Sequence, residues 1–208
     1  MSNDRLEAAA DRSEILEVAM TSLVCRDSGD MDSLAACFHP DALLTSSWFS
    51  GKASDFVEGA RKALATRHPG DSQKHIAGNP RVSLNSDRAI CEYYLTLYQR
   101  RTIDGYKFDF QTWSSFCDLF EQRNGAWRIS RRWVIYEKDR MDAYKVGEVP
   151  ESYFKPMDLS PFPPALRYHC WRNTNADHPP TKDLLIEGSS KTQAVRESTK
   201  KWLEGGTL

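Results

Sequence analysis

The sequence predicts an α+β fold in which three helices precede an antiparallel sheet. In the first third of the chain, apolar residues recur at helical spacing. From residue 76 onward they alternate with polar residues, as in strands that bury one face. The dipeptides Asp104-Gly105 and Asn124-Gly125 separate the later strands, and both are typical of tight hairpin turns. Consecutive hairpins make a meander, and the helices are expected to cover one face of its sheet.

The helices are delimited by capping residues and helix breakers. Asp11 and Glu14 form a capping-box pattern, and Ile15, Ala19 and Leu23 follow at four-residue steps, which predicts an amphipathic helix from about residue 11. A shorter helix is expected over 30–37 and a third over 52–66, with a strand over 42–49 between them.

Four long strands are expected over 76–84, 89–99, 108–120 and 127–136. After Val149 the composition changes, because seven of the ten prolines lie there and no alternation survives. This segment keeps too many aromatic residues for a disordered tail. We therefore expect it to pack on the body of the protein and to end in a helix over 189–203.

Composition excludes several classes of function. The chain has 208 residues, with 28 basic and 29 acidic side chains and a formal net charge of -1. A near-zero charge without basic runs argues against a nucleic-acid partner, and no apolar run approaches the ~18 residues of a membrane helix. The N-terminus does not resemble a secretory signal, so we expect a cytoplasmic protein that neither binds nucleic acid nor enters a membrane.

The five cysteines are odd in number and widely spaced, which predicts neither a disulfide framework nor a zinc site. We expect reduced thiols packed as small hydrophobic side chains. No His-x-x-x-His or clustered carboxylate pattern is present, so no metal site is expected.

Two residues stand out as candidate catalytic groups. The four-residue step through Ile15, Ala19 and Leu23 continues to Asp27, which places a carboxylate on the stripe that faces the core. His75 opens the first strand of the meander. A carboxylate that accepts a hydrogen bond from one imidazole nitrogen makes the other a better base near neutral pH. The alternative is a structural Asp or His, since polar residues at helix ends are frequently caps.

Four segments together resemble the SnoaL-like branch of the nuclear transport factor 2-like superfamily. They begin at Asp27-Ser-Gly-Asp, Phe38-His-Pro-Asp, Lys74-His-Ile-Ala-Gly-Asn and Phe120-Glu-Gln-Arg-Asn-Gly. The likeness spans about residues 9–140, which we take as one domain, with 141–208 as a proline-rich extension. It implies a cone-shaped α+β barrel, in which a curved antiparallel sheet wraps around a long N-terminal helix and leaves an apolar pocket.

Within this superfamily the sequence is similar to scytalone dehydratase and hexachlorocyclohexane dehydrochlorinase. These lyases use a His–Asp dyad and no metal or organic cofactor, and their two residues match His75 and Asp27. The resemblance leaves the substrate open, because the superfamily also includes cyclases, isomerases and non-catalytic members.

Aromatic and basic residues of the strands are candidates for substrate binding. The candidates that we select are Tyr94, Trp113, Arg131 and Trp133. Arg131 and Arg132 must face opposite sides of their strand, so one guanidinium points inward and needs a partner such as Asp27, an anion or a substrate oxygen.

The other histidines are expected to play minor parts. His39, His68 and His178 each precede a proline and are expected in exposed loops. His169, in the extension, is a weaker candidate for the pocket mouth.

The leading hypothesis is a cofactor-independent, dehydratase-like lyase that acts on a hydrophobic cyclic or polyketide-like small molecule. One alternative is a non-catalytic ligand-binding or assembly subunit, such as the small subunit of a ring-hydroxylating dioxygenase. Another is an isomerase or cyclase that uses the same pocket. The outer face of the sheet and the family resemblance also predict a homo-oligomer, either a dimer or a trimer.

Overall fold

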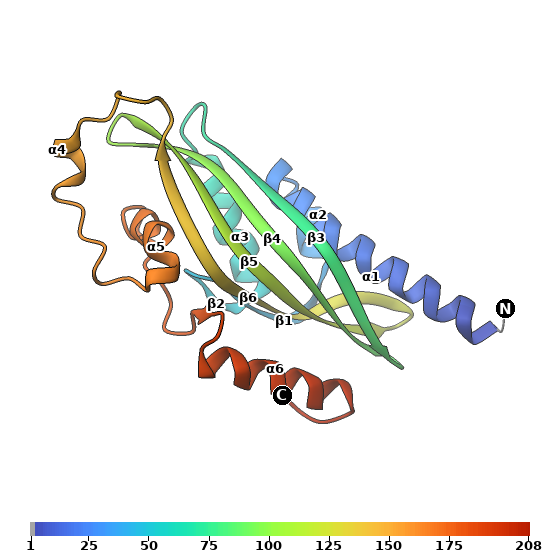
Figure 1. The fold of residues 1–208 in the computed structure, drawn as a ribbon. Coiled ribbons are helices and arrows are strands. Elements are labelled where there is room, and N and C mark those ends of the chain that lie inside the picture. Colours follow the sequence, from blue (N-terminus) through green and yellow to red (C-terminus); the bar gives the residue numbers. More distant parts are fainter. Residues whose placement is uncertain (1–2) are drawn as a thin grey trace.

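The computed structural model describes residues 3–208, which form a curved sheet with helices on its concave face and a C-terminal extension (Figure 1). Three helices, α1 (Asn3–Ser28), α2 (Met31–Ala36) and α3 (Ala53–Ala65), precede the long strands. The strands are β1 (Phe38–Thr45), β2 (Ser50–Lys52), β3 (Ser72–Asn85), β4 (Arg88–Ile103), β5 (Tyr106–Arg123), β6 (Ala126–Ala143) and β7 (Leu185–Ile186).

The sheet has the order β2-β1-β6-β5-β4-β3, with β7 paired to β6. The four long strands form the expected antiparallel meander, whereas β1 and β7 each run parallel to β6. Strands β2 and β3 are opposite edges in the described part of the chain, so the sheet curves without closing. The predicted α+β class is confirmed, and the cone is open on one side.

Both expected hairpin turns are present. Asp104 and Gly105 have φ values of 51° and 83°, and Asn124 and Gly125 have 55° and 77°. Positive φ at both central residues is the requirement of the turn that matches the twist of paired strands. These turns fix the register of β4, β5 and β6, and therefore decide which side chains share a face.

The start of the first helix differs from the prediction. Helix α1 begins at Asn3, and Asp11 lies inside it rather than at its cap. The upstream residues 6–10 are strong helix formers and extend the helix. Asp11 instead accepts a hydrogen bond from Trp127 Nε1 at 2.8 Å, and Glu14 accepts one from the Trp127 backbone N–H at 3.0 Å. The two carboxylates therefore tie the helix to β6.

Two apolar clusters lie on opposite faces of the sheet. The larger fills the concave side, where Ile15, Ala19 and Leu23 of α1 are buried as their spacing predicts. The smaller lies on the convex side beneath α6 (Ser190–Leu203) and includes Trp133 and Trp202. All five cysteines are free and buried, as expected.

The extension continues from β6 through α4 (Glu151–Phe154), a 3₁₀ turn (Pro164–Leu166) and α5 (Arg167–Thr174) to β7 and α6. Helix α5 contacts the strands β5 and β6, and α6 contacts β4 and β7. No helix within residues 3–208 is both long enough and apolar enough to cross a membrane.

Candidate functional site

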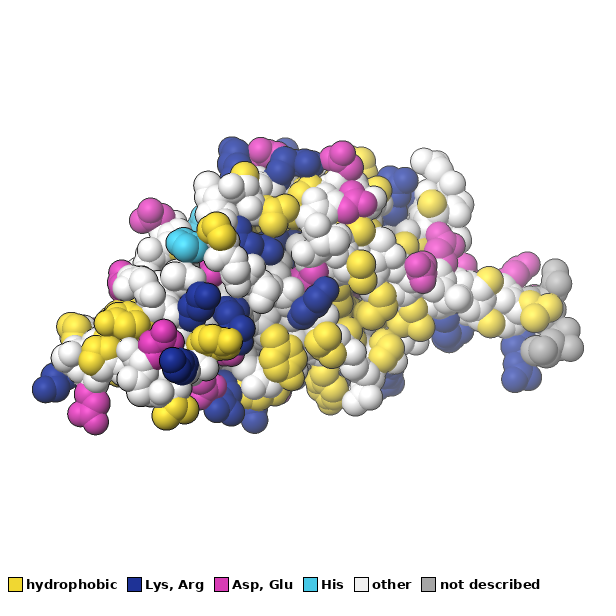
Figure 2. Space-filling model, turned by 90° about the horizontal axis from the view of Figure 1, so that it is seen from above, with side chains coloured by type: hydrophobic (Ala, Val, Ile, Leu, Met, Phe, Trp, Pro, Cys, Tyr) yellow, Lys and Arg dark blue, Asp and Glu magenta, His cyan; other side chains and the backbone are white. Residues whose placement is uncertain are grey.

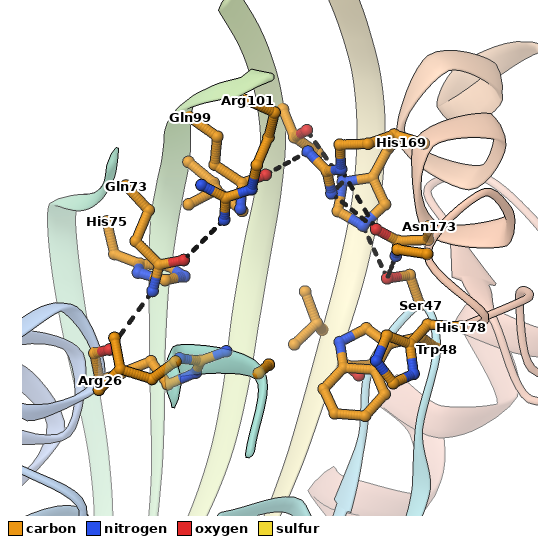
Figure 3. Close-up of a pocket in the computed structure, with 18 of the residues that line it drawn as sticks. Arg26, Ser47, Trp48, Gln73, His75, Gln99, Arg101, His169, Asn173 and His178 are labelled. Atoms are coloured by element: carbon orange, nitrogen blue, oxygen red, sulfur yellow. Dashed lines mark hydrogen bonds between the residues drawn. The ribbon is translucent and has the colours of Figure 1, made fainter. Parts of the chain in front are cut away.

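A cavity of about 830 Å³ lies between the concave face of the sheet, the helices α1 and α3, and helix α5 of the extension (Figure 3). This volume suits a small organic ligand. Its apolar lining comes from the three N-terminal helices and from strands β1, β4, β5 and β6. It includes Leu23, Leu34, Leu44, Phe56, Leu64, Leu95, Leu97, Phe116 and Val134.

His75 lines one wall of this cavity, and the side chain of Asp27 is hydrogen-bonded to it. His75 Nδ1–H donates to Asp27 Oδ1 at 2.6 Å, and the backbone N–H of His75 donates to Asp27 Oδ2 at 2.7 Å. The Asp27 and His75 side chains are only 6% and 13% exposed. Both carboxylate oxygens are therefore engaged by one residue, which fixes the imidazole and leaves its Nε2 as the nitrogen available to a ligand.

The pair forms because α1 ends beside the start of β3. Asp27 lies in the last turn of α1. Two residues before His75, the side-chain amide of Gln73 donates to the Arg26 carbonyl at 3.3 Å. Burial by itself raises the pKa of Asp27, but the hydrogen bonds and charge of His75 outweigh it and hold the pKa below its usual range. Asp27 is therefore an ionised acceptor at neutral pH, and this fixes the proton of His75 on Nδ1.

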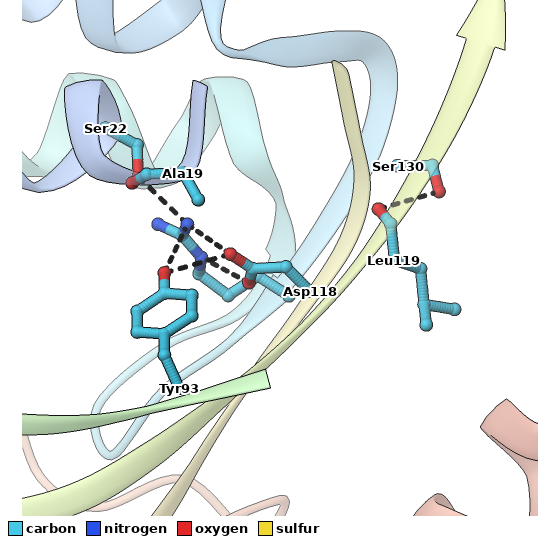
Figure 4. Close-up of polar contacts among 7 residues, drawn as sticks. Ala19, Ser22, Tyr93, Asp118, Leu119 and Ser130 are labelled. Atoms are coloured by element: carbon cyan, nitrogen blue, oxygen red, sulfur yellow. Dashed lines mark hydrogen bonds and ion pairs between the residues drawn. The ribbon is translucent and has the colours of Figure 1, made fainter. Parts of the chain in front are cut away.

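Arg132 is the inward-facing member of the arginine pair, and Asp118 rather than Asp27 compensates its charge (Figure 4). Arg132 Nε and Nη2 donate to Asp118 at 2.7 and 2.6 Å, and Nη2 also donates to Ser22 Oγ and Tyr93 Oη. Burial lowers the pKa of Arg132, but the charge of Asp118 outweighs it and raises the pKa above its usual value. Arg132 lines the cavity, and its Nη1 forms no hydrogen bond with any residue in 3–208.

The four residues predicted to bind substrate do not line this cavity. Tyr94 is 61% exposed on the convex face. Trp133 lies in the cluster beneath α6, and Arg131 stacks on it, with 4.7 Å between the guanidinium carbon and the ring centroid. Trp113 lies beneath the Lys138 ammonium at 4.6 Å. The cavity is lined instead by their sequence neighbours, because adjacent strand residues face opposite sides of a sheet. These neighbours are Leu95, Thr112, Ser114, Arg132 and Val134.

A second polar group lies at the opposite end of the cavity; it contains His169, the weaker candidate for the pocket mouth, together with Ser47, which the sequence did not single out. His169 is buried, and its Nε2 lies 2.7 Å from Ser47 Oγ. Its Nδ1 lies 3.1 Å from Thr112 Oγ1 and 3.2 Å from Arg172 Nη2. A guanidinium only donates, so Nδ1 is the acceptor and Nε2–H donates to Ser47.

This arrangement decides what the Ser47–His169 pair is able to do. Burial, followed by the charge of Arg172, lowers the pKa of His169 well below its usual value, so the ring is neutral. With its proton on Nε2, His169 cannot accept the Ser47 hydroxyl proton, and the pair is not an activated nucleophile. Ser47 instead has its own hydroxyl hydrogen available for a ligand. The only sequence feature that indicated this end was His169, within an aromatic segment between prolines.

The remaining histidines divide into two groups. His39 was expected in an exposed loop but is buried in β1, where its Nε2 lies 2.9 Å from the Glu121 carbonyl oxygen. Pairing of β1 with β6 buries the segment despite Pro40. His68 and His178 are exposed, as expected, and border the cavity; the ring of His178 lies 4.9 Å from that of Trp48.

Comparison with known proteins places this chain in a family. The model of the SnoaL-like domain matches residues 7–133, which span α1 to the middle of β6. Among curated proteins, the chain is 28% identical over 173 residues to pea pathogenicity protein 2 of Fusarium vanettenii, with 80% of this chain and 71% of that protein covered.

Solved structures with the same fold include two proteins named for elimination reactions. A hexachlorocyclohexane dehydrochlorinase of type 3 from Novosphingobium barchaimii matches with a TM-score of 0.57 and 17% identity, covering 70% of this chain and 99% of that one. A putative scytalone dehydratase from Novosphingobium aromaticivorans matches with a TM-score of 0.55 and 16% identity, covering 69% and 97%. At these identities the likeness establishes the cystatin-like, nuclear transport factor 2-like fold. Because the family model covers more than half of the chain, the protein belongs to the SnoaL-like domain family.

Proposed function

We propose that the protein is a cofactor-independent lyase that removes water from a cyclic small molecule, with Asp27 and His75 as its catalytic pair. The observation that carries this proposal is the Asp27–His75 pair, which is joined at 2.6 Å and leaves one imidazole nitrogen available to the cavity. An imidazole whose other nitrogen is held by an ionised carboxylate is suited to take a proton from carbon.

The reaction has two halves. His75 Nε2 removes the proton on the carbon next to a carbonyl group, and Asp27 stabilises the imidazolium that forms. Negative charge develops on the carbonyl oxygen, where Arg132 Nη1 is the donor available to receive it. The bond from the β-carbon to its hydroxyl oxygen then breaks, and the leaving oxygen takes the proton from the imidazolium. The products are an α,β-unsaturated carbonyl compound and water.

The fold comparisons support an elimination reaction, because two structural neighbours bear the names dehydrochlorinase and scytalone dehydratase. The apolar lining supports a hydrophobic cyclic substrate. An isomerase or cyclase would use the same base without losing water, and a non-catalytic subunit would leave the substrate unchanged.

The test uses a bicyclic β-hydroxy ketone, 3-hydroxy-1-tetralone, which yields 1-naphthol when it loses water. We expect the purified protein to form naphthol, and His75→Ala and Asp27→Asn each to lower turnover by about 10² or more. Asp41→Asn, a change at an exposed ion pair outside the cavity, is the matched control and should retain activity. Melting temperatures on the same variants separate lost chemistry from lost folding.

Each other outcome is also informative. Deuterium uptake from heavy water without naphthol would favour the isomerase, and no exchange or product would favour the non-catalytic subunit. A stable, fully active His75→Ala would end the mechanism. The double variant should lose little more than either single variant, since the two residues act as one unit.

A further inference from the structure

The cavity is lined by more arginines than the proposed reaction uses. Besides Arg132, four arginines line it: Arg26, Arg67, Arg101 and Arg172. None of these four forms an ion pair with a carboxylate anywhere in residues 3–208. An uncompensated guanidinium in a partly buried site is costly, so their gathering in one cavity needs a physical reason.

Neutral groups hold two of these arginines in place. Arg101 Nη2 donates to the Gln73 side-chain oxygen at 3.1 Å, and its Nη1 donates to backbone carbonyls, including that of Ser72 at 3.0 Å. Arg172 donates to the side-chain oxygens of Gln99 and Asn173. Amide oxygens orient a guanidinium without cancelling its charge, which leaves the charge available to a ligand.

The aspartates near these arginines are engaged elsewhere. Asp71 accepts from the backbone N–H and hydroxyl of Thr102 at 2.9 and 3.1 Å. Asp104 accepts from Tyr153 Oη, and Asp139 accepts from the backbone N–H of His169. Asp27 is occupied by His75. These hydrogen bonds leave the carboxylates charged, but among residues 3–208 only Asp71 and Asp104 line the cavity beside five arginines, so the lining retains a net positive charge.

The arginines are also close enough to affect one another. Burial, and then the charge of Arg67, lowers the pKa of both Arg26 and Arg101 to about 10. Burial and the charge of Arg101 lower the pKa of Arg172 to about 9. Arg101 thus lies at the centre of the group. An anion among these side chains would relieve both the repulsion and the desolvation.

We propose that the ligand of this cavity carries an anionic oxygen group, a carboxylate or a phosphate ester, and that Arg101, supported by Arg26 and Arg67, binds it. This inference deepens the proposed function and rests on it in taking the cavity as the substrate site. Arginine suits the role because its planar fork matches both oxyanions in a bidentate manner.

The separation of Gln73 and His75 along β3 also indicates the length of the ligand. The Arg101 guanidinium meets the side chain of Gln73, which is two residues before His75 on the same face of β3. Two residues along a strand correspond to about 7 Å. The anionic group and the reacting carbon should therefore be about 7 Å apart, roughly the length of two fused six-membered rings. Figure 3 shows Arg101, Gln73 and His75 on this wall, across the cavity from His169.

The test compares three probes with the same ring system by isothermal titration calorimetry at low ionic strength: 2-naphthoate, 2-naphthyl phosphate and the neutral 2-naphthamide. We expect at least one anion to bind about 10-fold or more tightly than the amide, since a charge-assisted hydrogen bond contributes on this scale. Whichever anion binds more tightly identifies the source of the charge.

Variants locate the effect. Arg101→Gln should remove most of the preference for the anion and leave amide binding unchanged, and Arg67→Gln should do so in part. Arg128→Gln is the matched control, because Arg128 is exposed on β6 and does not line the cavity. Equal affinity for anion and amide, no binding of any probe, or a preference that survives in Arg101→Gln would each overturn the inference.

The binding test is independent of turnover. If the anion preference fails while 3-hydroxy-1-tetralone is still dehydrated, only this inference falls. If the preference holds and no dehydration or exchange occurs, the proposed lyase falls while the anion site stands.

Discussion

Removal of the Asp118 carboxylate tests how strongly the buried ion pair supports both the fold and the cavity. Asp118 is fully buried and accepts three hydrogen bonds: from Arg132 Nε at 2.7 Å, from Arg132 Nη2 at 2.6 Å and from Tyr93 Oη at 3.0 Å. Asp118→Asn removes the negative charge and turns one acceptor into a donor that faces Arg132. An ion pair broken on one side in the interior costs about 3–5 kcal/mol.

An exposed pair supplies the comparison. Arg123 and Asp41 are also joined at 2.7 Å, but their side chains are 38% and 68% exposed. Asp41→Asn should cost no more than about 1 kcal/mol, because water replaces the lost partner. Asp41 accepts one hydrogen bond from Arg123, whereas Asp118 accepts two from Arg132, so burial and the bidentate contact both contribute to the expected difference.

Urea denaturation at neutral pH, analysed by linear extrapolation, gives the free energy of unfolding of both variants. The expected loss for Asp118→Asn is a large share of the 5–15 kcal/mol of a typical domain. The double change Asp118→Leu with Arg132→Met should recover much of it, because no charge is then left unpaired. If Asp118→Asn costs no more than Asp41→Asn, the reasoning from burial is refuted.

Three further predictions concern the extension and the convex face of the sheet. The pKa of His169 is depressed by burial and by Arg172, so its contribution to stability is present above the ordinary histidine pKa of about 6.5 and is lost as pH falls. His169→Asn should therefore lose less stability between pH 7.5 and 5.5 in thermal melts, and parallel losses would contradict this. Trp202 of α6 is 4% exposed, so Trp202→Ala should cost about 3–5 kcal/mol in urea, and a cost under 1 kcal/mol would mean that α6 is dispensable. The homo-oligomer expected from the sequence would use the convex strip around Tyr94 and Ile76, which are 61% and 55% exposed, so light scattering should give a multiple of the 23.8 kDa chain that Tyr94→Asp reduces to a monomer.

Figure 2 shows one face of the molecule, on which hydrophobic side chains gather beside basic and acidic ones. Scattered apolar residues are ordinary on a protein surface, so the mass in solution decides whether they form an interface.

Several features follow from the sequence alone because they depend on local physics. The two dipeptides with Gly after Asp104 and Asn124 require positive φ at both positions, so the hairpins and their register follow directly. Likewise, the four-residue step places Asp27 on the buried stripe of its helix before any partner is known.

Other features depend on which elements meet in space. Alternation divides Arg131 from Arg132, but only the packing of α1 on one face and α6 on the other decides that Arg132 points inward and that Trp133 joins the second cluster. Capping chemistry indicated a helix start at Asp11, yet the carboxylate serves β6 instead, because Trp127 lies within reach.

The polar end of the cavity, formed by Ser47 and His169, shows most clearly what sequence patterns do not predict. Ser47 and His169 are 122 residues apart in sequence and belong to segments with no shared periodicity. Their hydrogen bond exists because the extension folds back onto the strands β5 and β6 and places α5 there. Periodicity and turn chemistry reveal contacts within one element or between neighbours, whereas contacts between distant segments are decided by the burial of surfaces that exist only once the sheet has curved.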